Sequence, residues 1–300
     1  MSSIDSESIP NQSENKPVII KLLGLLSIVR WYNISLIIIS LYFVQLFMFN
    51  TSKRFFITLQ SLDTHLYVAA IVFSIMGGYV INAFYDFEKD MINQPQKTYF
   101  NRIVSKKSCL NLYIFCFLIS IIISYFINFR MLTFIISLNF SLWFYSHKLR
   151  KKPLLGEISA SLLMISFFVG LSILNLKIDK TLIIFSMYIF TIDLTREIVK
   201  KMISLKGDLI VGEKSIPILF GIKNSKYIIF FMMLSSIIAI LSLLPIVIKN
   251  AFSIYFVISL FMITFNIYLL HHAKNAKNYQ LINTCYKLIL GLAIFSIVLY

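Results

Sequence analysis

Long apolar runs separated by short charged segments constrain this chain more than any other feature. A helix needs about 20 apolar residues to cross the hydrocarbon core of a bilayer, and about 17 to 25 are tolerated. Of the 300 residues, 58% are hydrophobic and only 14% are charged, whereas about a quarter are charged in an ordinary soluble domain. The sequence therefore predicts an all-α, polytopic integral membrane protein.

Nine runs have a length that fits a membrane span, which predicts nine transmembrane helices. The fourth and the sixth are short, and each leads into a charged loop. Together they form one membrane domain over residues 20–300, preceded by a polar tail, 1–19, that we expect to be disordered. The nine runs are approximately Tyr32–Phe49, Leu66–Tyr85, Leu110–Ile127, Met131–Ser146, Leu154–Leu174, Thr181–Thr195, Tyr227–Ile248, Ala251–Leu270 and Leu281–Tyr300.

The basic residues predict how the chain is oriented. A net charge of +15 could suggest a nucleic-acid partner, but the basic residues lie in short loops and form no single soluble face. The N-terminus and the loops after the even-numbered runs carry 21 Lys and Arg residues, and the other loops carry six. Because Lys and Arg accumulate on the cytoplasmic side, we predict a cytoplasmic N-terminus and no nucleic-acid partner.

A group of polar residues at the end of the second run predicts a cation site. Asn82, Asp86 and Asp90 are spaced four residues apart, so on a helix they fall close to one face. Hard cations such as Mg²⁺ accept oxygen ligands of this kind and usually share them with substrate phosphates. The alternative is that these acids merely end a helix in a solvated loop.

Four segments together resemble the UbiA-type intramembrane prenyltransferases. The stretch NAFYDFEKDMINQPQK is similar to the first signature of that family, which is NxxxDxxxD followed by an N-x-P-x-K/R sequence. Three further motifs of the family have counterparts in this chain: an R-x-x-N entry, a Y-S…L-K-x-x-P-L-x-G loop and a second acidic loop. In this chain these segments are residues 82–97, Arg30–Asn33, Tyr145–Gly156 and Arg196–Gly221.

This resemblance implies an enzyme that transfers a prenyl group from its diphosphate with the help of Mg²⁺. It implies catalytic carboxylates, a metal and diphosphate site, phosphate-binding cations, an acceptor end, and one tyrosine at the reacting centre. Its partners would be a prenyl diphosphate, a hydrophobic acceptor and the lipid bilayer. The implied catalytic acids are Asp86, Asp90 and Asp208, and the same three residues together with Asn82 would bind the metal. The implied phosphate-binding cations are Lys97, Arg102 and Lys200. The acceptor end would be formed by Arg30 and Asn33, and the tyrosine at the reacting centre would be Tyr145.

The wording of the second loop is most similar to the geranylgeranylglycerol-phosphate geranylgeranyltransferase branch. This similarity implies a geranylgeranyl donor and a prenylglycerol phosphate acceptor, whereas an aromatic quinone precursor is the alternative acceptor. We predict a bacterial-type inner (cell) membrane as the location, with the active site on the cytoplasmic side. The sequence leaves the oligomeric state open.

The second acidic loop departs from the family pattern. The family normally has an acid four residues before the one that matches Asp208, but this position is Ser204, and Lys201 and Lys206 lie nearby. Three explanations follow: Asp193 or Glu197 substitutes for the acid, a lysine replaces a metal ion with its own point charge, or catalysis has been lost. A membrane transporter is a further alternative, because acids within membrane segments also mark ion pathways.

Overall fold

The computed structural model describes residues 18–49, 59–86, 106–212 and 214–300, and this part of the chain is all-helical without a strand. Each of the nine predicted runs coincides with a helix in it, which confirms the fold class. The helices are α1 (Val18–Val29), α2 (Trp31–Phe43), the π-helical η1 (Val44–Phe49), α4 (Leu62–Tyr85), α6 (Lys106–Ile127), α7 (Phe129–His147), the short η3 (Leu149–Lys151), α8 (Leu155–Asn175), α9 (Lys180–Ile203), α10 (Leu205–Val211), α11 (Ile216–Val247), α12 (Phe252–His272), α13 (Ala276–Ser296) and η4 (Ile297–Leu299).

Seven helices in the described part are long and apolar enough to cross a membrane. They are α2 with η1, α4, α6, α8, α11, α12 and α13. The long helices outside this set are α7 and α9, which correspond to the two shortest predicted runs and carry more polar residues. The chain is thus a multi-pass integral membrane protein, while the count of nine crossings and the orientation of the N-terminus remain predictions.

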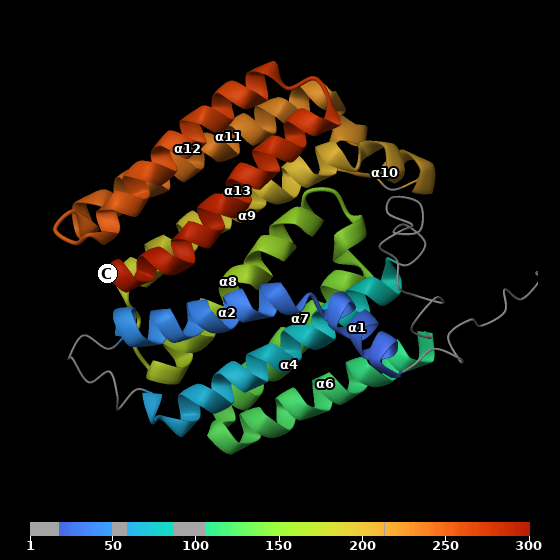
Figure 1. Ribbon diagram of the computed structural model, residues 1–300, viewed down its shortest axis with the longest axis vertical. Helices are drawn as coiled ribbons and strands as arrows, with labels where there is room; N and C mark the ends of the chain where they lie inside the picture. Colours follow the sequence, from blue (N-terminus) through green and yellow to red (C-terminus); the bar gives the residue numbers. More distant parts are fainter. Residues whose placement is uncertain (1–17, 50–58, 87–105, 213) are drawn as a thin grey trace, which may run out of the picture.

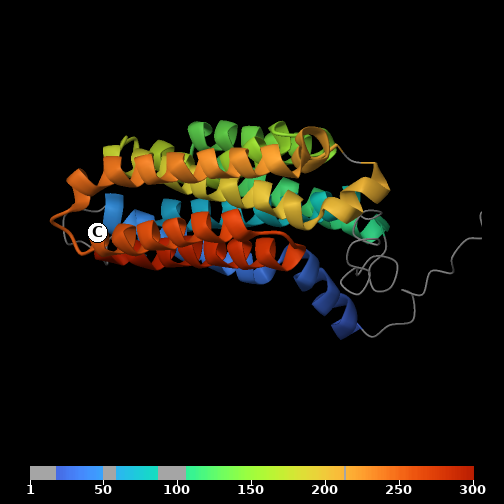
Figure 2. The same ribbon diagram turned by 90° about the horizontal axis from the view of Figure 1, so that it is seen from above.

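The long helices form a bundle in which α9 and α4 occupy central positions. Helix α9 packs against α8, α11 and α13, and α4 packs against α6 and α7. Figure 1 shows α9 and α11–α13 on one side and α2, α4, α6 and α7 on the other. Helix α8 joins the two sides, because it contacts both α7 and α9. In Figure 2 the helices run alongside one another, and α1 tilts away from them.

The core of the α9 side is built from aromatic rings. Phe185 on α9 lies with its ring centre 5.6 Å from that of Phe252 and 6.4 Å from that of Phe256, both on α12. The hydroxyls of Tyr188 and Tyr255 are 2.9 Å apart and buried. Buried aromatic side chains bring a large apolar area with few rotamers, and here they fix α9 against α12.

Short connections bring several helix ends together at one end of the bundle. The end of α4, the α7–η3–α8 connection and the α9–α10–α11 connection all lie there, on the α10 side of Figure 1. Helix α10 ends at Val211, and its C-cap Gly212 has a φ of 72°, in the left-handed region that glycine adopts without a Cβ penalty. The described residues of the motif segments that start at positions 82, 145 and 196 therefore lie toward this end.

Candidate active site

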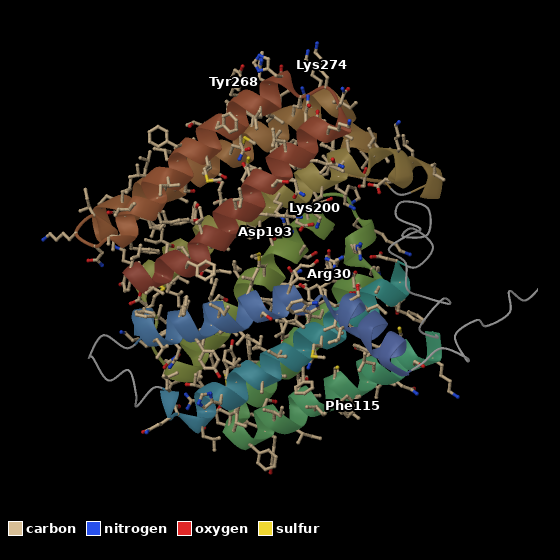
Figure 3. The ribbon with its side chains drawn as sticks, viewed as in Figure 1. Arg30, Phe115, Asp193, Lys200, Tyr268 and Lys274 are labelled. Atoms are coloured by element: carbon tan, nitrogen blue, oxygen red, sulfur yellow. The ribbon has the colours of Figure 1, made fainter. Side chains whose placement is uncertain are left out.

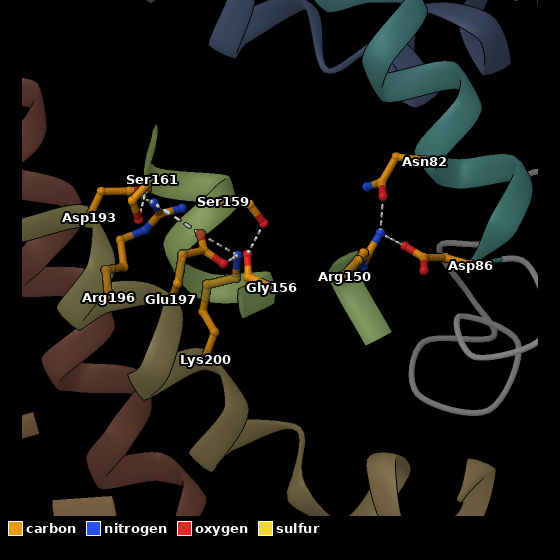
Figure 4. Close-up of polar contacts among 10 residues, drawn as sticks. All are labelled: Asn82, Asp86, Arg150, Gly156, Ser159, Ser161, Asp193, Arg196, Glu197 and Lys200. Atoms are coloured by element: carbon orange, nitrogen blue, oxygen red, sulfur yellow. Dashed lines mark hydrogen bonds and ion pairs between the residues drawn. The ribbon is translucent and has the colours of Figure 1, made fainter. Parts of the chain in front are cut away.

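Two oxygen ligands of the predicted cation site converge on one point. Asn82 and Asp86 lie at the end of α4, and Arg150 reaches them from η3 (Figure 4). The Nη1 atom of Arg150 donates to Oδ1 of Asn82 and forms an ion pair with Oδ2 of Asp86. Since a single nitrogen contacts both oxygens, the two side chains define one cation position, which the guanidinium occupies.

The end of α4 accounts for this geometry. The helix ends at Tyr85, and Asp86 follows as its C-cap, with its backbone N–H donating to the carbonyl of Asn82 at 3.0 Å. This confirms that Asn82 and Asp86 share a face. The Asp86 residue is only 8% exposed, so its charge requires a partner. Asp90, Lys97 and Arg102 lie outside the described residues.

A tight turn holds the main chain of Arg150 against the start of α8. The N–H of Gly156 donates to the carbonyl of Lys152 at 2.8 Å. A Cβ on Gly156 would lie 2.8 Å from the carbonyl oxygen of Arg150, so no larger residue fits without a backbone shift. Leu154, between them, has a φ of 65°, which is uncommon for a non-glycine residue. The turn therefore fixes where Arg150 enters the site.

A second polar cluster lies on the last turns of α9. Arg196 contacts Oδ1 of Asp193, and Nζ of Lys200 lies 2.8 and 2.7 Å from the two carboxylate oxygens of Glu197. Ser161 on α8 donates to Oδ2 of Asp193 at 3.1 Å. Figure 4 shows this cluster opposite the group formed by Arg150. Two acids and two bases make the cluster close to neutral.

The charges within this cluster determine how its acids behave. Glu197 lies beyond the predicted membrane run 181–195. Burial acts to raise its pKa, but Lys200 and Arg196 outweigh burial and lower the pKa to about 2, with a smaller contribution from Arg150. Arg150 therefore contacts Asn82 and Asp86 directly and stabilises the negative charge of Glu197 in the second cluster. Because Asp193 and Glu197 already have basic partners, their contacts do not favour the explanation that they replace the missing acid.

Ser204 and Asp208 form a separate contact at the junction of α9 and α10. The Ser204 hydroxyl donates to Oδ2 of Asp208 at 3.1 Å, and Asp208 is fully buried. Residues four apart on a helix face each other, so an acid at position 204 would place two carboxylates together. Lys206, in contrast, is exposed. The serine thus removes one negative charge from this site.

The residues predicted for the acceptor end surround Tyr79 on α4. The guanidinium of Arg30 lies 5.5 Å from the centre of the Tyr79 ring, and Nδ2 of Asn33 donates to the Tyr79 hydroxyl at 3.2 Å. Figure 3 places Arg30 centrally in the molecule, as it does Asp193, whereas Tyr268 lies at its edge. Arg30 itself is exposed and Asn33 is half-buried, so these two side chains are not enclosed in the core of the bundle.

The structure distributes the predicted residues that it describes over several groups, with Asp208 beside Ser204 and Lys200 beside Glu197. Asn82 meets Asp86 through Arg150, Arg30 meets Asn33 through Tyr79, and Tyr145 lies within electrostatic range of Arg30 and Glu197. Sequence reasoning did not single out Arg150, Tyr79 or Arg196, although Arg150 lies in the quoted motif and Tyr79 precedes Asn82 by one helical turn. Within the described ranges, no three His, Cys, Asp or Glu residues are grouped to hold a metal ion.

Comparison with known proteins decides the family. The model of the UbiA prenyltransferase family matches residues 41–296. The chain belongs to the UbiA prenyltransferase family. This finding confirms the resemblance seen in the sequence, and at the level of the family it confirms a prenyl-transferring enzyme.

Individual relatives of this UbiA-family chain come from archaea. It is 29% identical over 199 residues to the digeranylgeranylglyceryl phosphate synthase of Korarchaeum cryptofilum, covering 66% of this chain and 70% of that protein. It is 32% identical over 169 residues to the synthase of the same name from Sulfurisphaera tokodaii, covering 54% of this chain and 60% of that protein. Against several such relatives the match therefore spans less than two thirds of their length.

Solved structures confirm the fold. One, described as giving structural and mechanistic insights into digeranylgeranylglyceryl phosphate synthase in membranes, has a TM-score of 0.70 at 22% identity and covers 93% of this chain and 97% of that one. A UbiA homologue from Archaeoglobus fulgidus bound to DMAPP and Mg²⁺ has a TM-score of 0.65 at 15% identity, with 92% and 99% coverage. At these identities the likeness concerns the fold alone.

Proposed function

We propose that this protein transfers a geranylgeranyl group from geranylgeranyl diphosphate to a prenylglycerol phosphate in an Mg²⁺-dependent reaction. The observation that carries the proposal is the convergence of Asn82 and Asp86 on one cation position. The names of the curated relatives support the geranylgeranyl donor and the lipid-like acceptor.

The residues at the cation position fit Mg²⁺. Their donors are an amide oxygen and a carboxylate oxygen, which are hard ligands of the kind that Mg²⁺ takes, and the position already holds a positive charge. Asn82 and Asp86 would hold the ion together with Asp90, and Asp208 would contribute from α10. When bound, Mg²⁺ would neutralise charge on the leaving diphosphate. The Archaeoglobus fulgidus homologue bound to DMAPP and Mg²⁺ supports Mg²⁺ as the ion.

The basic residues would complete the binding of the diphosphate. Lys200 lies in the α9 cluster, and Lys97 and Arg102 would approach from the segment after α4. Lys201 on α9 lies within electrostatic range of the buried Glu157, so it faces the polar interior and suits the role of a point charge where relatives have an acid. The apolar helices around the site would exclude water, which would otherwise capture the developing prenyl cation.

The position of the acids argues against a transporter. Asp86 and Asp208 lie at the α10 end of the bundle, whereas transporter sites lie near the bilayer midplane. Asp193 lies near the middle of α9, where Arg196 and Ser161 hold its carboxylate. We place the α10 end on the cytoplasmic side, because the basic loops gather there, and we propose nine crossings. A bacterial-type inner membrane remains a prediction, and the relatives named above are archaeal.

The test is diphosphate release by the purified protein in detergent. Geranylgeranyl diphosphate is supplied with Mg²⁺, with and without geranylgeranylglyceryl phosphate, to the wild type, to Asp86→Asn and to Asp63→Asn. Asp63 is an exposed acid in the first turn of the same helix, so it is a matched control. Release that needs the acceptor, is lost in Asp86→Asn and is kept in Asp63→Asn supports the proposal.

The alternatives give different results in the same assay. Release only with an aromatic quinone precursor would contradict the acceptor. Binding of geranylgeranyl diphosphate without release with either acceptor would identify a catalytically silent relative. Movement of a substrate into liposomes without diphosphate release would show a transporter.

A further inference from the structure

Glu157 is a buried acid that the proposed function does not use. It lies in the first turn of α8, directly after Gly156, and is only 3% exposed. A buried carboxylate is costly unless its oxygens have partners. Its carboxylate is hydrogen-bonded to the backbone at the start of α8, whereas Oε2 has no hydrogen-bond partner among the described residues. One oxygen of a buried acid is therefore free to accept a proton or a hydrogen bond.

Charged and polar residues of the candidate active site surround Glu157. Glu157 lies within electrostatic range of Glu197 and Lys201 on α9 and of Tyr145 on α7. Asp193 and Arg30, which was predicted for the acceptor end, also act on the Tyr145 hydroxyl. Glu157 is thus linked electrostatically to the α9 cluster, and through Tyr145 to Arg30 of the acceptor end.

The two acids of the α9 cluster have their oxygens engaged. Both oxygens of Glu197 accept from Lys200, and Asp193 is held by Arg196 and Ser161. Glu197 therefore keeps its negative charge and is a poor proton acceptor, in agreement with a pKa of about 2. Glu157, in contrast to these two acids, is a buried carboxylate with an open oxygen, and the turn through Gly156 holds it in place.

We propose that Glu157 is the catalytic base that takes the proton from the hydroxyl of the acceptor. This step rests on the proposed function. The acceptor oxygen forms a bond to C1 of the prenyl group, the bond between C1 and the diphosphate oxygen breaks with its electron pair leaving on the diphosphate, and the hydroxyl proton moves to Oε2 of Glu157. The proton then passes to solvent when the product leaves.

The test compares Glu157→Gln with the wild type and with Asp63→Asn. A general base contributes about 10²- to 10⁴-fold to the rate, so we expect kcat to fall by at least about 100-fold. The KM for geranylgeranyl diphosphate and its Mg²⁺-dependent binding should stay within about threefold of the wild type, because the base acts on the acceptor. The wild-type kcat should decrease at low pH as Glu157 becomes protonated, and this acid limb should be absent in Glu157→Gln.

The outcomes separate this inference from the proposed function. No acceptor-dependent release by the wild type would overturn both. An active wild type with a Glu157→Gln kcat within about threefold, or with binding of the prenyl diphosphate lost together with kcat, would overturn the base alone. If Glu157→Gln does not fold, Glu157→Asp decides: a lower kcat with the acid limb kept supports the base, and an unchanged kcat overturns it.

Discussion

Arg150 places a permanent positive charge where Asn82 and Asp86 converge, so it competes with any cation for those oxygens. We expect Arg150→Gln to bind Mg²⁺ about tenfold more tightly in the absence of substrate, which corresponds to about 1.4 kcal/mol. Without Mg²⁺ the variant should be less stable, because removing one partner leaves the charge of Asp86 uncompensated. Calorimetric Mg²⁺ titration and thermal unfolding measure the two effects. Lys152→Gln, an exposed change in the same connection, is the control, and an unchanged Mg²⁺ affinity of Arg150→Gln would contradict the competition.

Ser204 offers a second test at the level of a single residue. Ser204→Asp would place a carboxylate beside Asp208, with which the serine now forms a hydrogen bond. An added charge about 4 Å from an ion is worth about 1 kcal/mol or more, or roughly fivefold in affinity. We therefore expect the Mg²⁺ concentration for half-maximal activity to fall at least about fivefold. Ser204→Asn controls for size, and an unaltered metal dependence would show that the site is not simply weakened.

Sequence spacing predicts contacts within a helix but not contacts between helices. Asn82 and Asp86, like Ser204 and Asp208, are four residues apart, so their shared faces follow from helix geometry. Arg150 is separated from Asn82 by 68 positions, and its approach depends on how the η3 turn packs against α4. Tyr79 meets Asn33 across 46 positions for the same reason. Arg150 and Tyr79 were therefore missed in the sequence because tertiary packing supplies them, whereas Arg196 pairs with Asp193 on the same helix.

At the level of elements, charged residues misled the prediction of where α9 ends. The apolar run ends at Thr195, but the helix continues to Ile203. Arg196 pairs with Asp193 and Lys200 with Glu197, both at a spacing of three residues, and such pairs stabilise a helix. The alternating charges that resemble a loop therefore extend the helix into the site.

A reciprocal amide pair should fix η1 against α8 at the end of the bundle away from the site. Gln45 and Asn175 each donate to the other, at 2.9 and 2.7 Å. We expect Gln45→Leu to destabilise the protein by about 1–3 kcal/mol, because it leaves the half-buried amide of Asn175 without this partner. The double variant Gln45→Leu/Asn175→Leu should recover much of this loss. Thermal unfolding of both in detergent measures the coupling, and a double variant less stable than the sum of its single changes would exclude a specific pair.

At the level of the whole molecule, α7 and α9 decide how the chain crosses the membrane. They are the long helices outside the seven that meet the length and hydropathy of a span. Loops with many Lys and Arg residues nevertheless alternate with loops that have few, and this alternation matches the two sides of the membrane only if both helices cross. If α7 did not cross, the exposed residues Phe129 and Lys152 at its two ends would lie on one side of the membrane. The same holds for the exposed residues Ile178, which precedes α9, and Lys214, which follows α10.

Cysteine labelling in sealed vesicles of known orientation tests this directly. In a variant without Cys109, Cys116 and Cys285, single cysteines are placed at the four positions flanking α7 and α9. We expect an impermeant thiol reagent to label positions 129 and 178 from the outside and positions 152 and 214 from the cytoplasmic side, because the loops rich in Lys and Arg stay in the cytoplasm. Labelling of 152 and 129 from the same side would remove α7 from the spans. Labelling of 152 and 214 from the outside would reverse the orientation and, with it, the side from which Mg²⁺ and the prenyl diphosphate reach Asp86.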